Sequence, residues 1–476
     1  MVVYSADPAI VAILSKRAVP QIAPGAVTKT AGRGFFTEGD NLTGAWEDQN
    51  GYFWTGRQSR RQSPEVHLFR PGFRARKPSI SDTLISMGRL TFLAFLLAAP
   101  LLAADPPRVF ILDGKFLLEH RADRALTAAA RAAADKVMTR GPYSVTQKTR
   151  LLPGGDKHDY MSQAPYWWAD PAKPDGLPYI RRDGERNPEI TQLPDHTNMD
   201  RVAADSQALA VAWYFTHDEK YAARAALVLR AWFLDAATRM NPNLTYAQGI
   251  PGMNDGRGTG IIESRGLTSV VDAVGLLAGS KNWPAADQQG MEQWFASFVE
   301  WLQTSKNGQD EAKAANNHGT FYDLQVADLA LFARQDDLAR KVLTDSRALR
   351  IAAQIEPDGR QPLETDRTRG ISYSVMNLNG LILLATLGER VGVDFWDYQT
   401  PDGRSIRKAL DWLVPYASGE KKWPYEQIEA YNPQDFVPAL LRAAAHYKET
   451  RYAAVAKSAD TSKDVPTLLL RLQVGK

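Results

Sequence analysis

Apolar residues recur at intervals of three and four along most of the chain after residue 105. This spacing puts them on one face of a helix and predicts a series of amphipathic helices. Turn-forming stretches such as Glu356-Pro357-Asp358-Gly359-Arg360 separate the segments, and the alternating pattern of strands is scarce. Consecutive helical hairpins without an interior linker indicate an all-α domain, an α/α toroid or incomplete α/α barrel. Helices are expected at 122–138, 199–215, 221–236, 264–277, 285–302, 319–333, 338–355, 373–390, 406–416 and 436–447.

Two long loops interrupt this pattern, at about 154–195 and 241–264. Both are rich in Trp, Tyr, Arg and Gly, which is typical of loops that build a functional surface. The first contains Tyr166, Trp167 and Trp168, and the second contains Arg257. Aromatic faces stack on sugar rings and arginines bind carboxylates bidentately. The same aromatic side chains would also serve to pin the loop to the helices.

The first hundred residues differ from the rest. Met87 and Arg89 precede a short apolar run that ends at Ala103-Ala104, the pattern of a secretory signal peptide. A buried core helix is the alternative. Since signal peptides lie at N-termini, we hypothesise that Met87 is the true start and that residues 1–86 are a disordered upstream extension. Residues 87–104 would then be removed, leaving 105–476 as a single mature domain in the periplasm or outside the cell.

The net charge changes meaning under this hypothesis. The full chain carries a formal charge of +3 with a pI of about 8.8, which alone would suggest a polyanion or nucleic-acid partner. Residues 1–86 hold 11 of the 57 basic and 7 of the 54 acidic residues, so the remainder has 46 and 47. We therefore expect no nucleic-acid partner, and any attraction for polyanions must be local to a groove. There is no cysteine, and we identified no further apolar run long enough to span a membrane.

The most informative stretch is Asn316-Asn317-His318-Gly319, which opens an apolar helical segment. About fifty residues later the chain supplies Arg367, Arg369 and Tyr373. A histidine, an amide, arginines and a tyrosine suit removal of a proton next to a carboxylate, the chemistry of uronic-acid elimination. Asn317 as a helix N-cap and Tyr373 as a core residue are the structural alternatives.

These motifs resemble the alginate-lyase superfamily of polysaccharide lyases, particularly the branch that acts on β-1,4-linked glucuronate or mannuronate. The resemblance extends over about 158–447 and implies an α/α toroid, metal-free β-elimination, no cofactor and an anionic polysaccharide as partner. Gly370 blurs whether Arg367 or Arg369 matches the family arginine. The motifs are Tyr160-Met161-Ser162 with Tyr166-Trp167-Trp168, Gly256-Arg257-Gly258, Gly260-Ile261-Ile262, Asn316-Asn317-His318-Gly319, Arg367 with Tyr373, and Trp423-Pro424-Tyr425.

Roles follow from the chemistry. Asn317 donates hydrogen bonds to the substrate carboxylate, and His318 either adds a donor or acts as base. Glu311, seven residues before His318, would be protonated beside that carboxylate and donate to it. Arg367 would lower the pKa of Tyr373, which takes the C5 proton and passes it to O4. The candidate substrate-binding residues are His158, Tyr166, Trp167, Trp168, His196, Tyr246, Arg257, Arg265, Arg369 and Tyr425.

Substrate stereochemistry decides how many groups are needed. In β-linked glucuronate and mannuronate H5 and O4 share a face, so a single tyrosine serves both proton transfers. Guluronate places them on opposite faces, and His318 as base with Tyr373 as acid would be required.

Two other classes of function remain open from the sequence. A glycoside hydrolase on the same scaffold needs two carboxylates flanking the bond, for which Asp255, Glu263, Glu311, Glu364 and Asp366 are candidates. A periplasmic sugar-binding protein would use the aromatic groove without catalysis. No constellation of two histidines and a carboxylate has a spacing that suits a metal, so none is expected.

Overall fold

The computed structural model describes residues 42–47, 53–58 and 105–475. The chain divides into two units, Met1–Leu96 and Leu97–Lys476. Within the first, β1 (Leu42–Glu47) pairs antiparallel with β2 (Phe53–Gln58). The proposed signal peptide at 87–104, and the rest of the proposed extension at 1–86, lie outside the described residues.

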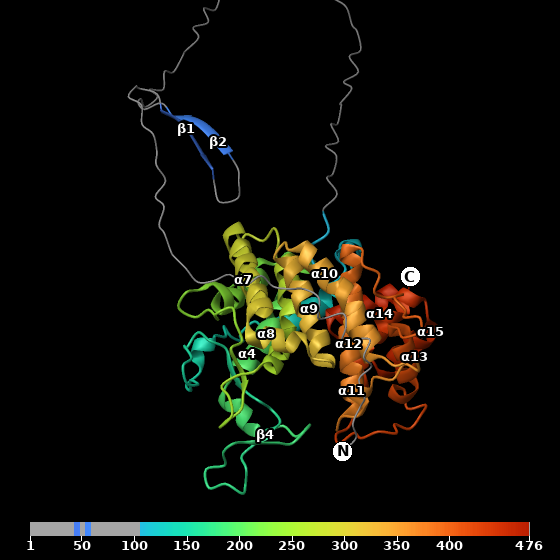
Figure 1. Cartoon of the computed structure of the whole chain (residues 1–476). Helices are drawn as coiled ribbons and strands as arrows, with labels where there is room; N and C mark the ends of the chain where they lie inside the picture. Colours follow the sequence, from blue (N-terminus) through green and yellow to red (C-terminus); the bar gives the residue numbers. More distant parts are fainter. Residues whose placement is uncertain (1–41, 48–52, 59–104, 476) are drawn as a thin grey trace, which may run out of the picture. The chain divides into compact units, whose positions relative to one another are not determined.

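The second unit is predominantly helical, as the apolar spacing predicts (Figure 1). Within residues 105–475, short strand pairs lie in the loops: β3 (Met161–Gln163) with β6 (Tyr246–Gly249), and β4 (Trp167–Trp168) with β5 (Ile180–Arg181). The helices are α2 (Gly114–Glu119), α3 (Arg124–Asp135), α4 (Asp195–Thr216), α5 (Glu219–Leu229), α6 (Leu267–Leu276), α7 (Ala285–Thr304), α8 (Lys306–Ala312), α9 (Asn317–Phe332), α10 (Asp336–Ser346), α11 (Pro362–Thr365), α12 (Gly370–Val391), α13 (Ile406–Ala417), α14 (Val437–Tyr447), α15 (Thr450–Ala459) and α16 (Val465–Val474).

Burial separates the helices into an inner and an outer layer. Nearly every residue of α6 and α9 is buried, whereas α3, α10 and α13 bury a single stripe. A helix that is buried all round must have neighbours on every side, while a one-sided helix covers the outside. The inner helices contact one another in the order α4, α6, α9, α12 and α14, and outer helices flank them. This is the predicted α/α toroid.

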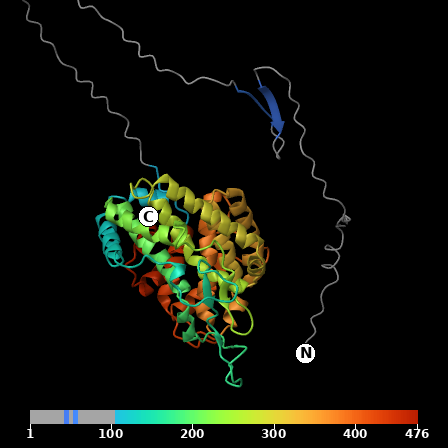
Figure 2. The same cartoon turned by 90° about the vertical axis from the view of Figure 1, so that its left-hand side faces the viewer.

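The ring closes between distant ends of the sequence. Helix α16 packs against α14 and also against α3, which in turn contacts α4. In Figure 2 the sequence colours run from cyan and green on one side to yellow and orange on the other, and the red elements return toward the cyan helices. Helix α16 therefore closes the ring between α14 and α3.

A segment without regular secondary structure, residues 108–113, crosses one end of the toroid. Asp272 on α6 accepts hydrogen bonds from the backbone N–H groups of Phe110 (2.5 Å) and Leu112 (2.7 Å). Arg390 near the end of α12 donates to the carbonyls of the same two residues, and Arg442 on α14 donates to that of Ile111. This end of the inner helices is thereby tied together across the toroid, and we call it the base.

Two expected helices end early. Those expected at 221–236 and 338–355 stop as α-helices at Leu229 and Ser346, and each continues as one turn of π-helix, Arg230–Leu234 and Arg347–Ala352. The apolar spacing persists through these turns, so the change in hydrogen-bond pattern leaves no mark in the sequence.

The length and hydropathy of helix α12 are those of a membrane-spanning helix. The sequence analysis did not identify this apolar run. Most of it is buried inside the protein, against α9, α13 and α14. The core helix of a folded domain has the same composition, and α12 is such a helix.

Candidate active site

A cavity of about 700 Å³ opens where inner helices begin, at the end opposite the base. His196 lies in the first turn of α4, Asn317 and His318 begin α9, and Tyr373 lies in the first turn of α12. The first backbone N–H groups of a helix lack intrahelical partners and carry partial positive charge. Several helix starts around one cavity therefore favour an anionic ligand.

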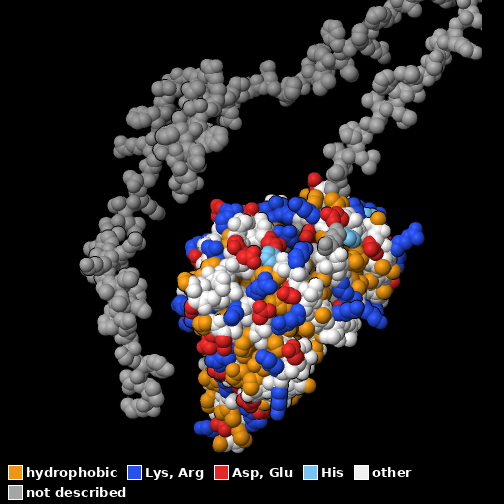
Figure 3. Space-filling model, turned by 90° about the vertical axis from the view of Figure 1, so that its right-hand side faces the viewer, with side chains coloured by type: hydrophobic (Ala, Val, Ile, Leu, Met, Phe, Trp, Pro, Cys, Tyr) orange, Lys and Arg blue, Asp and Glu red, His pale blue; other side chains and the backbone are white. Residues whose placement is uncertain are grey.

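The side chains of the cavity strengthen this preference. Its acidic lining residues are Glu263 and Asp435. On the face drawn in Figure 3, side chains of both signs of charge are interspersed. The lining of the cavity contains more basic than acidic side chains. The arginines that line it are Arg181, Arg186, Arg257, Arg265, Arg367 and Arg369.

His318 is held by Glu311. Its Nδ1 lies 2.6 Å from Oε1 of Glu311, which is buried at the end of α8, and His318 itself remains partly exposed to the cavity. The two residues are seven positions apart in the chain and belong to different helices, because α8 ends at Ala312 and α9 begins at Asn317. The break folds Glu311 back onto His318, so the carboxyl group serves the histidine, where we had expected it beside the substrate.

Asn317 is held by Glu364 on α11. The backbone N–H of Asn317 donates to Oε1 of Glu364 (2.6 Å) and its Nδ2 donates to Oε2 (2.7 Å). Both residues are buried, and burial raises the pKa of Glu364 to about 7 although these two hydrogen bonds oppose the shift. The N-cap of α9 is Asn316, whose side chain accepts from the N–H of His318. The side-chain amide of Asn317 therefore does not cap α9, which was the structural alternative to a functional role.

The two candidate arginines differ in their partners. Arg367 donates to both oxygens of Asp183 (3.0 and 2.9 Å), and its guanidinium carbon lies 4.1 Å from the centroid of the Tyr373 ring. Arg369 pairs with Glu429 at 2.9 Å. Although burial opposes it, the contact with Arg367 keeps the pKa of Asp183 below its usual value. Arg367 is therefore the arginine placed to act on Tyr373.

Tyr373 donates its hydroxyl hydrogen bond to the hydroxyl of Tyr166 across the cavity (2.9 Å). Burial, followed by the neighbouring Tyr166, raises the pKa of Tyr373 well above its ordinary value, and Arg367 only partly offsets them. We had expected Arg367 to leave this phenol with a lowered pKa. Its influence has the expected sign, but removal of the ring from water is the larger effect.

The remaining wall is built on η4 (Gly258–Gly266) and the loops before it. Buried Glu263 accepts hydrogen bonds from Tyr160 (2.8 Å) and Ser162 (2.6 Å), and Nδ1 of His196 lies 3.6 Å from its other oxygen. Arg257 donates to Gln248 and lies 5.9 Å from the Trp167 ring centroid.

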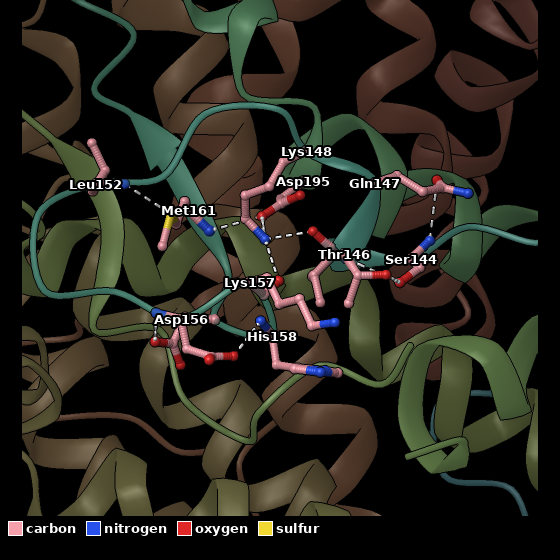
Figure 4. A network of polar contacts seen from close by, with 12 residues as sticks. Ser144, Thr146, Gln147, Lys148, Leu152, Asp156, Lys157, His158, Met161 and Asp195 are labelled. Atoms are coloured by element: carbon pink, nitrogen blue, oxygen red, sulfur yellow. Dashed lines mark hydrogen bonds and ion pairs between the residues drawn. The ribbon is translucent and has the colours of Figure 1, made fainter. Parts of the chain in front are cut away.

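A buried ion pair supports this wall from behind (Figure 4). Nζ of Lys148 lies 3.0 Å from Asp195 at the start of α4, and both side chains are fully buried. Lys148 also donates to the carbonyl of Lys157, and the N–H of Met161 donates to Asp195. The network fastens residues 145–161 to the helix turn that carries His196.

Most of the predicted site residues meet in this cavity: Asn317, His318, Arg367 and Tyr373, with Glu311 behind His318, and Tyr166, Trp167, His196, Arg257, Arg265 and Arg369 around them. Four predicted binding residues are not among those that line it. His158 contacts the carbonyl of Arg239, and Trp168 donates to the carbonyl of Glu185. Tyr246 belongs to β6 behind the wall, and Tyr425 packs against Trp412 and Trp423.

Two of the partners that hold these side chains, Asp183 and Glu364, were not predicted as such from the sequence. Asp183 went unnoticed, and Glu364 was considered only as a hydrolase carboxylate. Gln248 carries a positive φ of 51°, which a side chain rarely adopts and which no sequence pattern reveals. Within residues 105–475, no group of three or more His, Asp or Glu side chains is placed to hold a metal ion.

Comparison with known proteins agrees with this geometry. The model of the alginate lyase family matches residues 144–423. An alginate lyase from Bacteroides ovatus is 38% identical, with 76% of this chain and 99% of that chain covered and a TM-score of 0.73. Alginate lyase A1-III from Sphingomonas species A1 is 18% identical over 69% of this chain and 88% of that chain, with a TM-score of 0.46. No curated protein matches the chain. The chain belongs to the alginate lyase family and is a polysaccharide lyase.

Proposed function

We propose that the protein cleaves a β-1,4-linked uronan, glucuronan or mannuronate-rich alginate, by β-elimination. The observation that carries this is the meeting of Asn317, His318, Arg367 and Tyr373 in one arginine-lined cavity. The Bacteroides ovatus relative, matched over 99% of its length, is named an alginate lyase, which favours a uronan over a neutral polysaccharide.

The first task of the site is to acidify the C5 proton. Its removal leaves a carbanion beside the uronate carboxylate, so charge develops on the carboxylate oxygens in the transition state. Asn317 and His318, adjacent at the start of α9, are placed to donate hydrogen bonds there. The arginines around the cavity hold the neighbouring uronates.

The second task is proton transfer. Tyr373, as phenolate, takes the proton from C5, and the C4–O4 bond breaks as the C4–C5 double bond forms. The same phenol returns the proton to the leaving O4, which ends as a hydroxyl. Because the proton is only relayed, one side chain completes the reaction on glucuronate or mannuronate.

His318 determines whether guluronate can be cleaved, because in this sugar H5 lies on the face opposite to O4. Its Nδ1 is engaged by Glu311 at 2.6 Å, which leaves Nε2 for the substrate. With Nδ1 protonated and Nε2 free the ring accepts a proton, and with both nitrogens protonated it donates to the carboxylate. Guluronate cleavage requires the first state, with Tyr373 as acid.

Ultraviolet absorbance tests the proposal, because an unsaturated uronate absorbs in the near ultraviolet whereas a hydrolysis product does not. Glucuronan, mannuronate-rich alginate and guluronate-rich alginate should be compared, and we expect absorbing products from at least one of the first two. New reducing ends without absorbance would favour the hydrolase. Binding without new ends would favour a sugar-binding protein.

We further propose that the protein is exported and that residues 105–476 form the mature enzyme, cleaved close to Ala104. The motive is the pattern of Arg89, the apolar run and Ala103-Ala104. N-terminal sequencing of material from the periplasm or medium tests this. A cytosolic protein that retains Met87, or peptides from residues 1–86 in the mature protein, would contradict it.

A further inference from the structure

Asn317 is gripped at two points by one carboxyl group. Oε1 of Glu364 accepts the backbone N–H of Asn317 at 2.6 Å and Oε2 accepts its side-chain Nδ2 at 2.7 Å. Each residue is about 1% exposed. This fork uses both oxygens of the carboxylate on a single partner, so it fixes the side chain of Asn317 relative to its own backbone.

The chemistry of the fork dictates which end of the amide faces where. Above the pKa of Glu364, which is about 7, the carboxylate is ionised and only accepts hydrogen bonds. At the alkaline pH at which Tyr373 is expected to act, the amide must therefore turn its nitrogen toward Glu364 and its oxygen away. Nδ2 carries two protons, and Glu364 takes one of them. The geometry leaves the second for a group in the cavity, which Asn317 lines.

Glu364 and Arg367 belong to one turn of the chain. The backbone carbonyl of Glu364 accepts from the N–H of Arg367 at 3.2 Å and closes this turn. A buried amide chain then runs behind it, in which Asn377 on α12 donates to Gln361 (2.8 Å) and to Gln354 (2.9 Å). Gln354 in turn donates to the carbonyl of Asn316, directly before Asn317.

We propose that Glu364 is a positioning residue of the elimination reaction, which orients the Asn317 amide so that its second proton meets the substrate carboxylate. This inference rests on the proposed function of Asn317. Glu364 needs no contact with the substrate to act, since its influence passes through the amide. A misplacement of about 1 Å at such a group costs on the order of 100-fold in rate.

The charge of Glu364 separates this role from a purely structural one. A carboxylate close to the cavity repels an anionic substrate, and Arg367 is the charged group that faces Glu364. Glu364→Gln removes the repulsion but also replaces one of the two accepting oxygens by an NH2 group, which cannot accept, so the two-point hydrogen bonding to Asn317 is lost. We therefore expect kcat to fall about 10- to 100-fold while KM stays unchanged or decreases.

The experiment is a double-mutant cycle on the full chain, with the uronan that the wild type cleaves fastest. It compares wild type, Glu364→Gln, Asn317→Ala and the double variant, each checked by thermal unfolding. If Glu364 acts through Asn317, the double variant loses no more kcat than Asn317→Ala alone. Losses that multiply, or a wild-type kcat for Glu364→Gln, would overturn the proposal.

A second variant covers failure to fold. Glu364→Asp keeps the acceptor and the charge but draws the oxygens back by one methylene, and the same cycle with Asn317→Ala applies to it. If the wild-type protein releases no unsaturated product from any uronan, the proposed function itself fails. An active wild type with an unimpaired Glu364 variant counts against Glu364 alone.

Discussion

At the scale of single side chains, each group that we propose to act on the substrate has a partner from another segment. Tyr373 has Tyr166, His318 has Glu311, Asn317 has Glu364 and Arg367 has Asp183. Side chains fixed in this way lose little further freedom when a substrate binds, so their orientation is prepared before the reaction.

Tyr373→Phe should nearly abolish kcat and leave substrate binding close to normal. The ring keeps its packing while the oxygen that moves the proton is lost, and acid–base help is worth about 10²- to 10⁴-fold. Steady-state kinetics and a binding titration measure the two effects. Tyr425→Phe is the matched control, since Tyr425 lies outside the cavity lining, and it should retain activity. A near-normal kcat for Tyr373→Phe on glucuronan and mannuronan would refute tyrosine-based elimination.

The rate should rise toward alkaline pH. Tyr373 must lose its proton to act as base, and its raised pKa means that the reactive fraction increases as pH increases. Arg367 lowers the pKa of Tyr373 and so partly offsets the effect of burial. Arg367→Ala should therefore raise this pKa further and move the alkaline limb of kcat/KM to higher pH. An unchanged pH profile in this variant would show that Arg367 does not act on the phenol.

At the scale of elements, the sequence predicted the helices well because apolar periodicity reports burial directly. Helices α9 and α12, which carry most of the reacting groups, begin within three residues of their expected positions. The roles of Asp183 and Glu364 were missed because these residues lie in a loop and in one short helical turn, where no period exists. Which residues face each other across the cavity depends on the closure of the ring, and that is not encoded locally.

Close packing around the start of α9 explains why a glycine occupies position 319 in the Asn-Asn-His-Gly motif. A Cβ at this position would overlap the carbonyl of Ala314 and the guanidinium of Arg350, which forms a buried ion pair with Asp323. Gly319→Ala should therefore destabilise the protein by about 1–3 kcal/mol through overpacking, and it should lower activity because the start of α9 shifts.

Gly290→Ala in α7 is the control for this substitution. Its Cβ would meet only the flexible end of Leu234. Alanine is favoured over glycine inside a helix by about 1 kcal/mol, so this variant should be neutral or slightly stabilised. Thermal or denaturant unfolding of both variants provides the comparison, and equal stability of the two would remove the packing explanation of the motif.

The helical unit has the arginine-lined cavity at one end and the base at the other. Burial raises the pKa of Asp272 in the base to about 6, against the backbone N–H groups and Arg390 that favour its charged form. Its neighbour Asp328 is also buried with a raised pKa, and Arg442 faces the pair. The base thus contains more acidic groups than its surroundings readily keep ionised.

Stability should accordingly decline as pH rises from about 4 to about 6. A folded-state pKa above the unfolded value means that the stabilisation is complete below the unfolded pKa of Asp272 and is lost as pH passes its folded pKa. Unfolding in denaturant across this range measures the effect. Asp272→Asn, which resembles the protonated form, should flatten the decline, and a decline of undiminished steepness would assign it to other groups.

The contact between α16 and α3 has a consequence for how the chain acquires its shape. These helices are separated by more than three hundred residues. Residues 108–113 likewise receive the hydrogen bond from Arg442 only after α14 has been synthesised. Early helical hairpins can assemble locally, but the circle has no closing piece until the C-terminal helices have left the ribosome. Contacts so distant in sequence slow the search for the native state. We therefore expect the toroid to remain open during synthesis. The active enzyme should form only in one late folding step, when α16 packs against α3.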